Sequence, residues 1–151
     1  MKNIPEEGVT SICPTTITQT EEVLTKAVRN VANVVKEGYE GAEILGIHFE
    51  GPYLDMKYKG AQPEQCIVKP DVEQFKRYQA AADGLIKVIT MATEQDDDFK
   101  LTKYCAETGV RVSIGHSAAT IEEAGMAIAN GATGMTHIFN GMTPFHHRKP
   151  G

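Results

Sequence analysis

The feature that most constrains the fold is an alternation of short β-branched runs with longer stretches of helical periodicity. The run 9–13 (VTSIC) precedes a helical stretch at 20–38, and a second apolar run at 43–51 (EILGIHFEG) follows it. Within the helical stretch, apolar residues recur every three or four positions, acids follow Thr20, and Gly38 ends the pattern. These three segments predict a β-α-β unit.

The same alternation continues to the end of the chain. Apolar runs typical of buried strands are linked by helical segments, which implies a parallel sheet with right-handed connections. Five strands and four helices are expected in all, without a linker or a low-complexity segment. The chain is therefore predicted to be α/β, either an open doubly wound sheet or an arc of a (β/α)8 barrel. The further strands are expected at 86–92, 110–115 and 134–139, and the further helices at 71–83, 95–108 and 120–130.

Composition excludes several classes of function. With 41% hydrophobic residues in 151, the chain has enough apolar material for one globular core. A net charge of -5 argues against a nucleic acid partner or an anionic membrane surface, and no apolar run approaches the roughly 18 residues of a membrane span. The N-terminus lacks the apolar core of a signal peptide. Three widely spaced cysteines (Cys13, Cys66, Cys105) form no CxxC pair, so reduced thiols and a cytoplasmic location are expected.

Polar side chains with metal-binding groups follow three of the predicted strands. Glu50 ends one strand, His116 ends the next but one, and His137 lies in the last. The carboxyl ends of parallel strands meet at one edge, where ligands bind in both candidate architectures. Singly, each residue could be a solvated acid or a loop histidine. Together, one Glu and two His form the ligand set of an open catalytic zinc site.

Several further motifs occur in order through nearly the whole chain: ICPTTIT, GIHFEGPYL, KGAQPEQ, VSIGHSAAT and THIFNGMTPFHHRKPG. Together they resemble a known family, the N-acetylglucosamine-6-phosphate deacetylases of the amidohydrolase superfamily. The resemblance implies a (β/α)8 barrel enzyme that hydrolyses the acetamide of N-acetylglucosamine-6-phosphate, giving glucosamine-6-phosphate and acetate. The implied partner is thus a small amino-sugar phosphate. It also implies that Glu50, His116 and His137 bind a divalent metal, for which zinc is favoured and iron is the alternative.

Five further residues acquire expected roles from the resemblance. Ala61 and Gln62 fall where the family's loop approaches the sugar and the reacting acetamide, and Asn140, Gly141 and Arg148 fall where it holds the sugar phosphate. Some family members carry His where this chain has Gln62. A Gln amide can donate a hydrogen bond to an oxyanion but cannot carry a positive charge.

Parts of the family pattern are missing from these 151 residues. Members are more than twice as long, with a β-sandwich from both termini, an early HxH strand and a proton-transferring Asp on the last barrel strand. Residues 1–151 are therefore expected to be a single barrel segment, strands two to six of eight, in which the catalytic acid–base residue is unknown. Open sheet edges lead us to expect a homo-oligomer. Two alternatives stay open: another amidohydrolase acting on an N-acyl or cyclic amide, and a non-catalytic metal-binding or assembly fragment.

Three other polar features have simpler interpretations. His48 lies two residues before Glu50 and so projects to the same side of the strand, and the resemblance implies that it is a core residue below the metal ligands. The pair His146 and His147 is assigned to a loop or a subunit contact. The acidic run 94–98 (EQDDD) is expected to be a solvated loop that caps the following helix.

Overall fold

Short parallel strands and four α-helices make up the computed structural model, which describes residues 2–150. Met1 and Gly151, the two ends of the expected segment, lie outside the described residues. The strands are β1 (Ser11–Ile12), β2 (Glu43–Ile44), β3 (Ile47–Glu50), β4 (Ile86–Met91), β5 (Arg111–Ile114) and β6 (Ala132–Met135). The helices are α1 (Glu21–Glu37), α2 (Val72–Ala81), α3 (Lys100–Glu107) and α4 (Ile121–Ala129).

Strand order decides between the two architectures that the sequence left open. β3, β4, β5 and β6 form one parallel sheet in chain order, and β1 pairs with β2 beside it. A parallel bridge between Thr15 and His48 also brings the chain after β1 alongside β3. The order has no reversal, whereas a doubly wound sheet reverses at its switch point. The predicted α/β class is confirmed, and the arrangement is that of a barrel arc.

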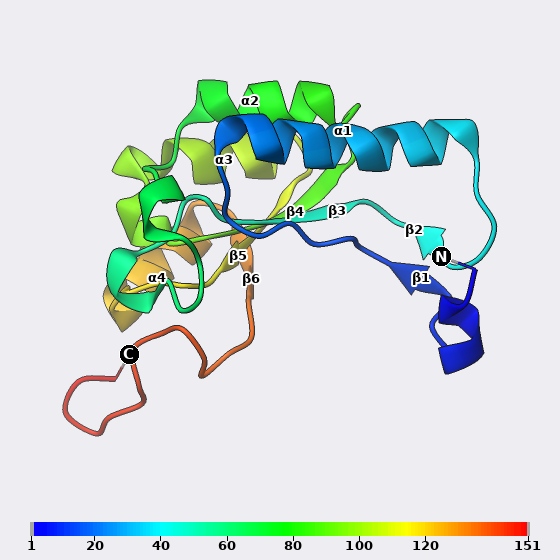
Figure 1. Ribbon diagram of the computed structural model, residues 1–151. Coiled ribbons are helices and arrows are strands. Elements are labelled where there is room, and N and C mark those ends of the chain that lie inside the picture. The colour runs from blue at the N-terminus through cyan, green and yellow to red at the C-terminus, as the bar shows by residue number, and fades with distance from the viewer. Residues whose placement is uncertain (1, 151) are drawn as a thin grey trace.

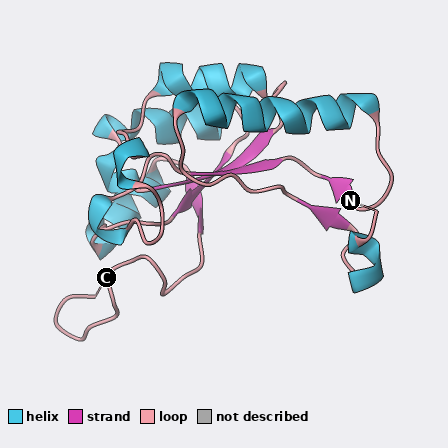
Figure 2. Cartoon of the chain, viewed as in Figure 1, coloured by secondary structure: helices cyan, strands magenta, loops and turns pink. Residues whose placement is uncertain are grey.

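The helices cover the sheet on one side. Helices α1, α2 and α3 lie over the same face of β3, β4 and β5 (Figure 1), and the separation of the helical layer from the strands is plain in Figure 2. Side-chain caps start three of the helices: Thr20 accepts from the Val23 amide, Asp71 from Gln74, and Thr120 forms a capping box with Glu123. Among the described helices, none combines the length and apolarity that crossing a bilayer would demand.

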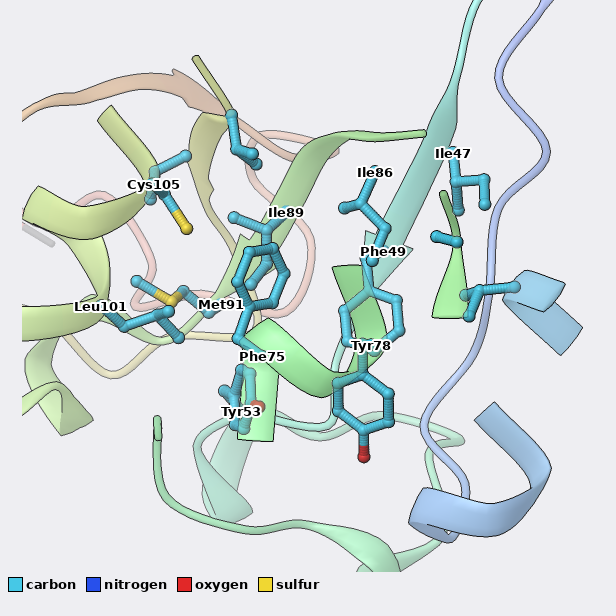
Figure 3. Close-up of a cluster of buried hydrophobic side chains, with 14 of the residues drawn as sticks. Ile47, Phe49, Tyr53, Phe75, Tyr78, Ile86, Ile89, Met91, Leu101 and Cys105 are labelled. Atoms are coloured by element: carbon cyan, nitrogen blue, oxygen red, sulfur yellow. The ribbon is translucent and has the colours of Figure 1, made fainter. Parts of the chain in front are cut away.

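The hydrophobic core fills the space between this helical layer and the sheet. In β3 burial alternates, so that Ile47 and Phe49 are fully buried while His48 and Glu50 are half-buried. The Phe49 ring packs against Tyr78 and Phe75 of α2, with ring centroids 4.9 and 6.2 Å apart (Figure 3). The apolar face of β3 thus holds the helices, and its other face is left for the polar site.

The structure corrects several predicted boundaries. The run expected as one strand at 43–51 is two strands, β2 and β3, separated at Gly46. A Cβ at Gly46 would lie 2.9 Å from the Leu85 carbonyl oxygen, so only glycine lets the chain leading into β4 pass this close. The helix expected from 95 begins at Lys100, because 3-10 turns occupy Thr93–Gln95 and Asp97–Phe99.

The last strand is also shorter than expected. The prediction extended it over 134–139, but β6 ends at Met135. His137 and Phe139 have positive φ values of 32° and 73°, which no strand residue adopts. The chain instead turns at residues 137–140, where the Asn140 amide donates to the His137 carbonyl at 2.9 Å. This early end places His137 in a turn at the edge of the sheet.

Candidate metal centre

Three side chains converge at the carboxyl edge of the four-stranded sheet. His116 Nε2 lies 3.1 Å from Glu50 Oε1 and 3.1 Å from His137 Nε2, and His137 Nε2 lies 3.8 Å from the same carboxylate oxygen. One ligand atom from each residue fits within 4.8 Å of the others. The structure therefore brings together the three residues that the sequence singled out.

Each of these residues lies at or just beyond the end of a strand. Glu50 is the last residue of β3, His116 comes two residues after β5, and His137 comes two residues after β6. Both histidines have positive φ, 50° for His116 and 32° for His137. A side-chain-bearing residue adopts this region at a cost, and such backbone is typical of functional sites.

Backbone carbonyls fix the orientation of both imidazole rings. His116 Nδ1 lies 2.7 Å from the Tyr58 carbonyl oxygen, and His137 Nδ1 lies 3.0 Å from that of Asn140. A carbonyl only accepts, so both Nδ1 atoms carry the proton and donate it. The Nε2 lone pairs of neutral rings are then free, which is the arrangement of metal-ligating histidines.

The three facing groups of Glu50, His116 and His137 would be stabilised by a positive charge placed between them. Two Nε2 lone pairs and a carboxylate oxygen face one another, and nothing positive separates them unless one ring becomes imidazolium. The hydrogen bond and charge of Glu50 raise the pKa of His116, while the hydrogen bond from His116 lowers the pKa of Glu50 against the opposing effect of burial. A proton shared between His116 and Glu50 is one solution, and a divalent metal with Nε2, Nε2 and carboxylate ligands is the other. The donor set therefore fits the expected metal.

Gln62 lies in contact with this cluster. Its side chain is buried, its Nε2 donates to Glu50 Oε1 at 3.2 Å, and its Oε1 accepts from the Thr18 amide at 2.7 Å. Both ends of the amide are engaged, so in this structure Gln62 orients the carboxylate. Ala61 is exposed on the same loop, whose Gly60 lies close to His116.

The residues expected to hold the phosphate divide into two groups. Asn140 and Gly141 belong to the turn around His137, and a Cβ on Gly141 would lie 3.3 Å from His116 Nδ1 and 3.5 Å from His137 Cε1. Arg148 is exposed on the terminal segment, which projects away from the helices and sheet (Figure 1). Its backbone amide donates to His146 Nδ1 at 3.2 Å. The structure brings Asn140 and Gly141 to the cluster and leaves Arg148 apart from it.

His48 lies on the same face of β3 but has other partners. Its Nε2 is 2.6 Å from Thr90 Oγ1, its Nδ1 is 3.3 Å from Thr15 Oγ1, and the hydroxyl chain continues from Thr90 through Thr136 to Ser113. Desolvation lowers the pKa of His48, which favours its neutral form. As expected, it is a hydrogen-bonded residue of the interior face, one layer removed from the three candidate ligands.

Sequence reasoning missed two kinds of contributor to this centre. The Tyr58 and Asn140 carbonyls orient the rings, but backbone groups leave no signature in residue type. Glu94 was interpreted as part of a solvated acidic loop, yet it is half-buried and accepts hydrogen bonds from Ser117 and Ala118. Its place just after β4 was the available signal, since the same position at a strand end drew attention to Glu50.

Comparison with known proteins gives consistent matches. An N-acetylglucosamine-6-phosphate deacetylase of Bacillus subtilis is 43% identical over 151 residues, 98% of this chain and 38% of the relative. The enzyme of the same name from Lysinibacillus sphaericus is 43% identical over 146 residues, 97% of this chain and 38% of the relative. This chain thus spans little more than a third of the length of these relatives. No family model matches it.

A solved structure matches the fold as well as the sequence. A mutant N-acetyl-D-glucosamine-6-phosphate deacetylase from Mycobacterium smegmatis, in complex with N-acetyl-D-glucosamine-6-phosphate, superposes with a TM-score of 0.87 at 33% identity. The match covers 94% of this chain and 36% of that one. The fold described above is therefore a segment of the fold of that enzyme.

Proposed function

Because this chain corresponds along its length to a segment of the N-acetylglucosamine-6-phosphate deacetylase family, we propose that it carries the metal centre and part of the sugar-phosphate site of such an enzyme. The reaction is metal-dependent hydrolysis of the acetamide of N-acetylglucosamine-6-phosphate to glucosamine-6-phosphate and acetate. The single observation that carries the proposal is the convergence of Glu50, His116 and His137, with both imidazole Nε2 atoms directed at one carboxylate oxygen. The other amidohydrolase reactions and the purely structural fragment lack comparable support.

The metal of this proposal is divalent, with zinc favoured because two imidazoles and a carboxylate leave an open position in a four-coordinate shell. When bound, such a metal lowers the pKa of a bound water and polarises a carbonyl. The chain's own residues set up this chemistry. The Tyr58 and Asn140 carbonyls hold the ring protons at Nδ1, and Gln62 orients the Glu50 carboxylate through its amide.

Substrate contacts are assigned to the loops around the same edge. Ala61 and Gln62 border the centre from the loop after β3, and the turn at Asn140 and Gly141 borders it from the loop after β6. Gly141 allows a close backbone approach, so its amide is suited to a phosphate oxygen. The Asn140 amide donates to the His137 carbonyl in this structure, so Asn140 shapes the turn that presents Gly141. The catalytic acid–base group is not assigned within the chain, and acetate release by these residues alone is expected near the background rate of the metal.

Sugar binding tests this proposal without relying on turnover. N-acetylglucosamine-6-phosphate is titrated calorimetrically into the protein, first stripped of metal and then loaded with one equivalent of zinc. We expect binding only to the zinc-loaded form, and loss of binding in His116→Asn. Glu107→Gln, which changes an exposed residue at the end of α3 outside the cluster, should bind as the wild type does. The proposal would be contradicted if the zinc-loaded wild type showed no binding of N-acetylglucosamine-6-phosphate.

Arg148 is proposed to recognise the 6-phosphate, although it is exposed and its backbone amide bonds to His146 and not to the candidate ligands in this structure. A charge-assisted contact is worth about 1.5–3 kcal/mol, or roughly 10- to 150-fold in affinity. Arg148→Ala should weaken binding of N-acetylglucosamine-6-phosphate by about that factor and leave binding of unphosphorylated N-acetylglucosamine unchanged. Equal losses for both sugars would assign Arg148 to structure.

Three broader expectations remain proposals. The chain is proposed to be strands two to six of a barrel, consistent with its chain-order sheet and its coverage of about 38% of its relatives. A homo-oligomer is proposed because large apolar side chains are exposed at the edge formed by α4 and β6. A cytoplasmic location is proposed because Cys13, Cys66 and Cys105 are all free thiols.

A further inference from the structure

We propose that Glu94 is a positioning residue that holds His116 in its ligating orientation, an inference that rests on the metal centre proposed above. Glu94 lies in the turn Thr93–Gln95, directly after β4, and does not touch the three candidate ligands. Its carboxylate instead reaches across to the turn that follows β5. Glu94 therefore acts on the backbone that follows His116.

Both carboxylate oxygens of Glu94 bind the two residues after His116. Oε2 accepts from the Ser117 hydroxyl at 2.7 Å, and Oε1 accepts from the Ala118 amide at 2.6 Å. The Ser117 hydroxyl oxygen also accepts from the Ala119 amide at 3.0 Å. The Ser117 hydroxyl proton is therefore donated to Glu94. Both carboxylate oxygens of Glu94 accept a hydrogen bond, and a glutamine at this position would offer only one acceptor oxygen.

Gln95, the neighbour of Glu94, is linked to the carbonyl group of His116 through Asp55. The His116 carbonyl accepts from the Asp55 amide at 2.9 Å, and Asp55 Oδ2 accepts from Gln95 Nε2 at 3.0 Å. The Ser117 amide donates to the Gly141 carbonyl at 3.1 Å. Glu94 and Gln95 together therefore restrain the chain around His116.

His116 needs this restraint because of its backbone conformation. Its φ of 50° lies in the left-handed region, which persists for a side-chain-bearing residue only when the surroundings over-determine it. If the contacts after His116 were released, the ring would leave the point where its Nε2 meets Glu50 and His137. Groups that orient ligands without binding metal contribute typically 10- to 100-fold to metal affinity.

A matched control lies two residues away on the same loop. Asp96 is a buried carboxylate that accepts from the Leu101 and Thr102 amides and from the Thr102 hydroxyl, at 2.8 to 3.1 Å. These bonds start α3 and do not reach the turn at His116. Asp96→Asn therefore perturbs a more deeply buried carboxylate with similar bonding that has no hydrogen bond to the turn at His116.

The experiment titrates Co²⁺ into metal-free protein, with the dissociation constant and the visible absorption bands of bound cobalt as readouts. Glu94→Gln and Ser117→Ala are compared with Asp96→Asn and wild type, and urea unfolding of each metal-free protein reports stability. We expect Glu94→Gln to raise the Kd for Co²⁺ by about 10- to 100-fold and to change the cobalt bands. Ser117→Ala should raise the Kd by a smaller factor, and Asp96→Asn should lower stability with an unchanged Kd.

Two results would overturn the inference. One is an unchanged Kd and spectrum in folded Glu94→Gln and Ser117→Ala. The other is an equal loss of affinity in Asp96→Asn, which would reduce the effect to general destabilisation. If Glu94→Gln does not fold, the Kd of Ser117→Ala is the test, because this substitution removes only the hydrogen bond from the Ser117 hydroxyl to Glu94. A wild type that binds no cobalt is a distinct outcome that defeats the metal centre itself, and this inference with it.

Discussion

Gly141 lies beside both candidate histidine ligands, and the space that a side chain would need at this position is bordered by their two rings. Its φ is 58°, and an added Cβ would lie 3.3 Å from His116 Nδ1 and 3.4 Å from the Tyr58 carbonyl oxygen. Gly141→Ala should therefore destabilise the protein by about 1–2 kcal/mol in urea unfolding. It should also weaken Co²⁺ binding, because the methyl group presses on the ring that the Tyr58 carbonyl orients.

Gly125→Ala is the matched control for that substitution. Gly125 lies inside α4 with nothing within 4 Å of its Cβ position, so an alanine there meets no neighbour. It should stabilise the protein by about 0.5–1 kcal/mol through helix propensity and leave metal binding unchanged. A neutral effect of Gly141→Ala, or equal effects at both positions, would contradict the crowding described at Gly141.

His116 and Glu50 predict a pH dependence in the metal-free protein. The raised pKa of His116 gives stability that is present below its ordinary value of 6.5 and is lost as the pH rises through the raised value. The lowered pKa of Glu50 gives stability that is present above 4.5 and is lost as the pH falls through the lowered value. The pair should therefore stabilise most between pH 4.5 and 6.5.

His116→Asn tests this window, because asparagine tolerates the positive φ but cannot be protonated in this range. Urea unfolding in the presence of a chelator gives the difference in stability between wild type and variant at each pH. We expect the difference to be largest inside the window and to shrink above it. A difference that stays flat from about pH 5 to 9 would show that the two side chains do not share a proton.

Among the helices and strands, the helix ends marked by caps and breakers were predicted more accurately than the strand ends. Thr20 and Gly38 predicted the two ends of α1, which runs from Glu21 to Glu37 with Thr20 accepting from the Val23 amide. The helix expected at 120–130 begins at Ile121, after a capping box between Thr120 and Glu123 with bonds of 3.2 and 2.8 Å. The strand expected over 134–139 ends early because His137 and Phe139 adopt positive φ. Helix signals are local contacts within one turn, whereas the end of a strand depends on where its neighbour stops pairing.

The capping box of α4 yields a direct prediction. Thr120→Ala removes the acceptor for the Glu123 amide and should lower the free energy of unfolding by about 1 kcal/mol. Urea unfolding measures this effect, and Thr10→Ala serves as the control because Thr10 is an exposed threonine outside the helices and strands. Equal stability of the Thr120 and Thr10 variants would mean that tertiary contacts, and not the cap, define the start of α4.

At the scale of the whole molecule, the open edge of the arc has consequences. Ile121 and Ile128, seven residues apart on one face of α4, and Met135 of β6 are 47–58% exposed, so large apolar side chains face solvent beside the last strand. The chain should therefore run as a dimer or larger species in light scattering, and Ile128→Lys should reduce its mass. Glu107→Lys, on the exposed surface of α3, should not. A monodisperse monomer would contradict the expected association.

The α/β class, the four helices and the three residues of the candidate centre were readable from the residues alone. Periodicity and helix caps are local signals, and parallel strands must bring their carboxyl ends to one edge. Tertiary structure was needed for the chain-order sheet, for the division of β2 from β3 at Gly46, and for the ring orientations set by the Tyr58 and Asn140 carbonyls. The sheet order and the Gly46 and Tyr58 contacts join residues distant in sequence. The Asn140 carbonyl lies only three residues from His137, but it is a backbone group that residue type does not encode. Glu94 combines both kinds of feature. Its position just after a strand could be predicted from the sequence, but its hydrogen bonds with Ser117 and Ala118 could not.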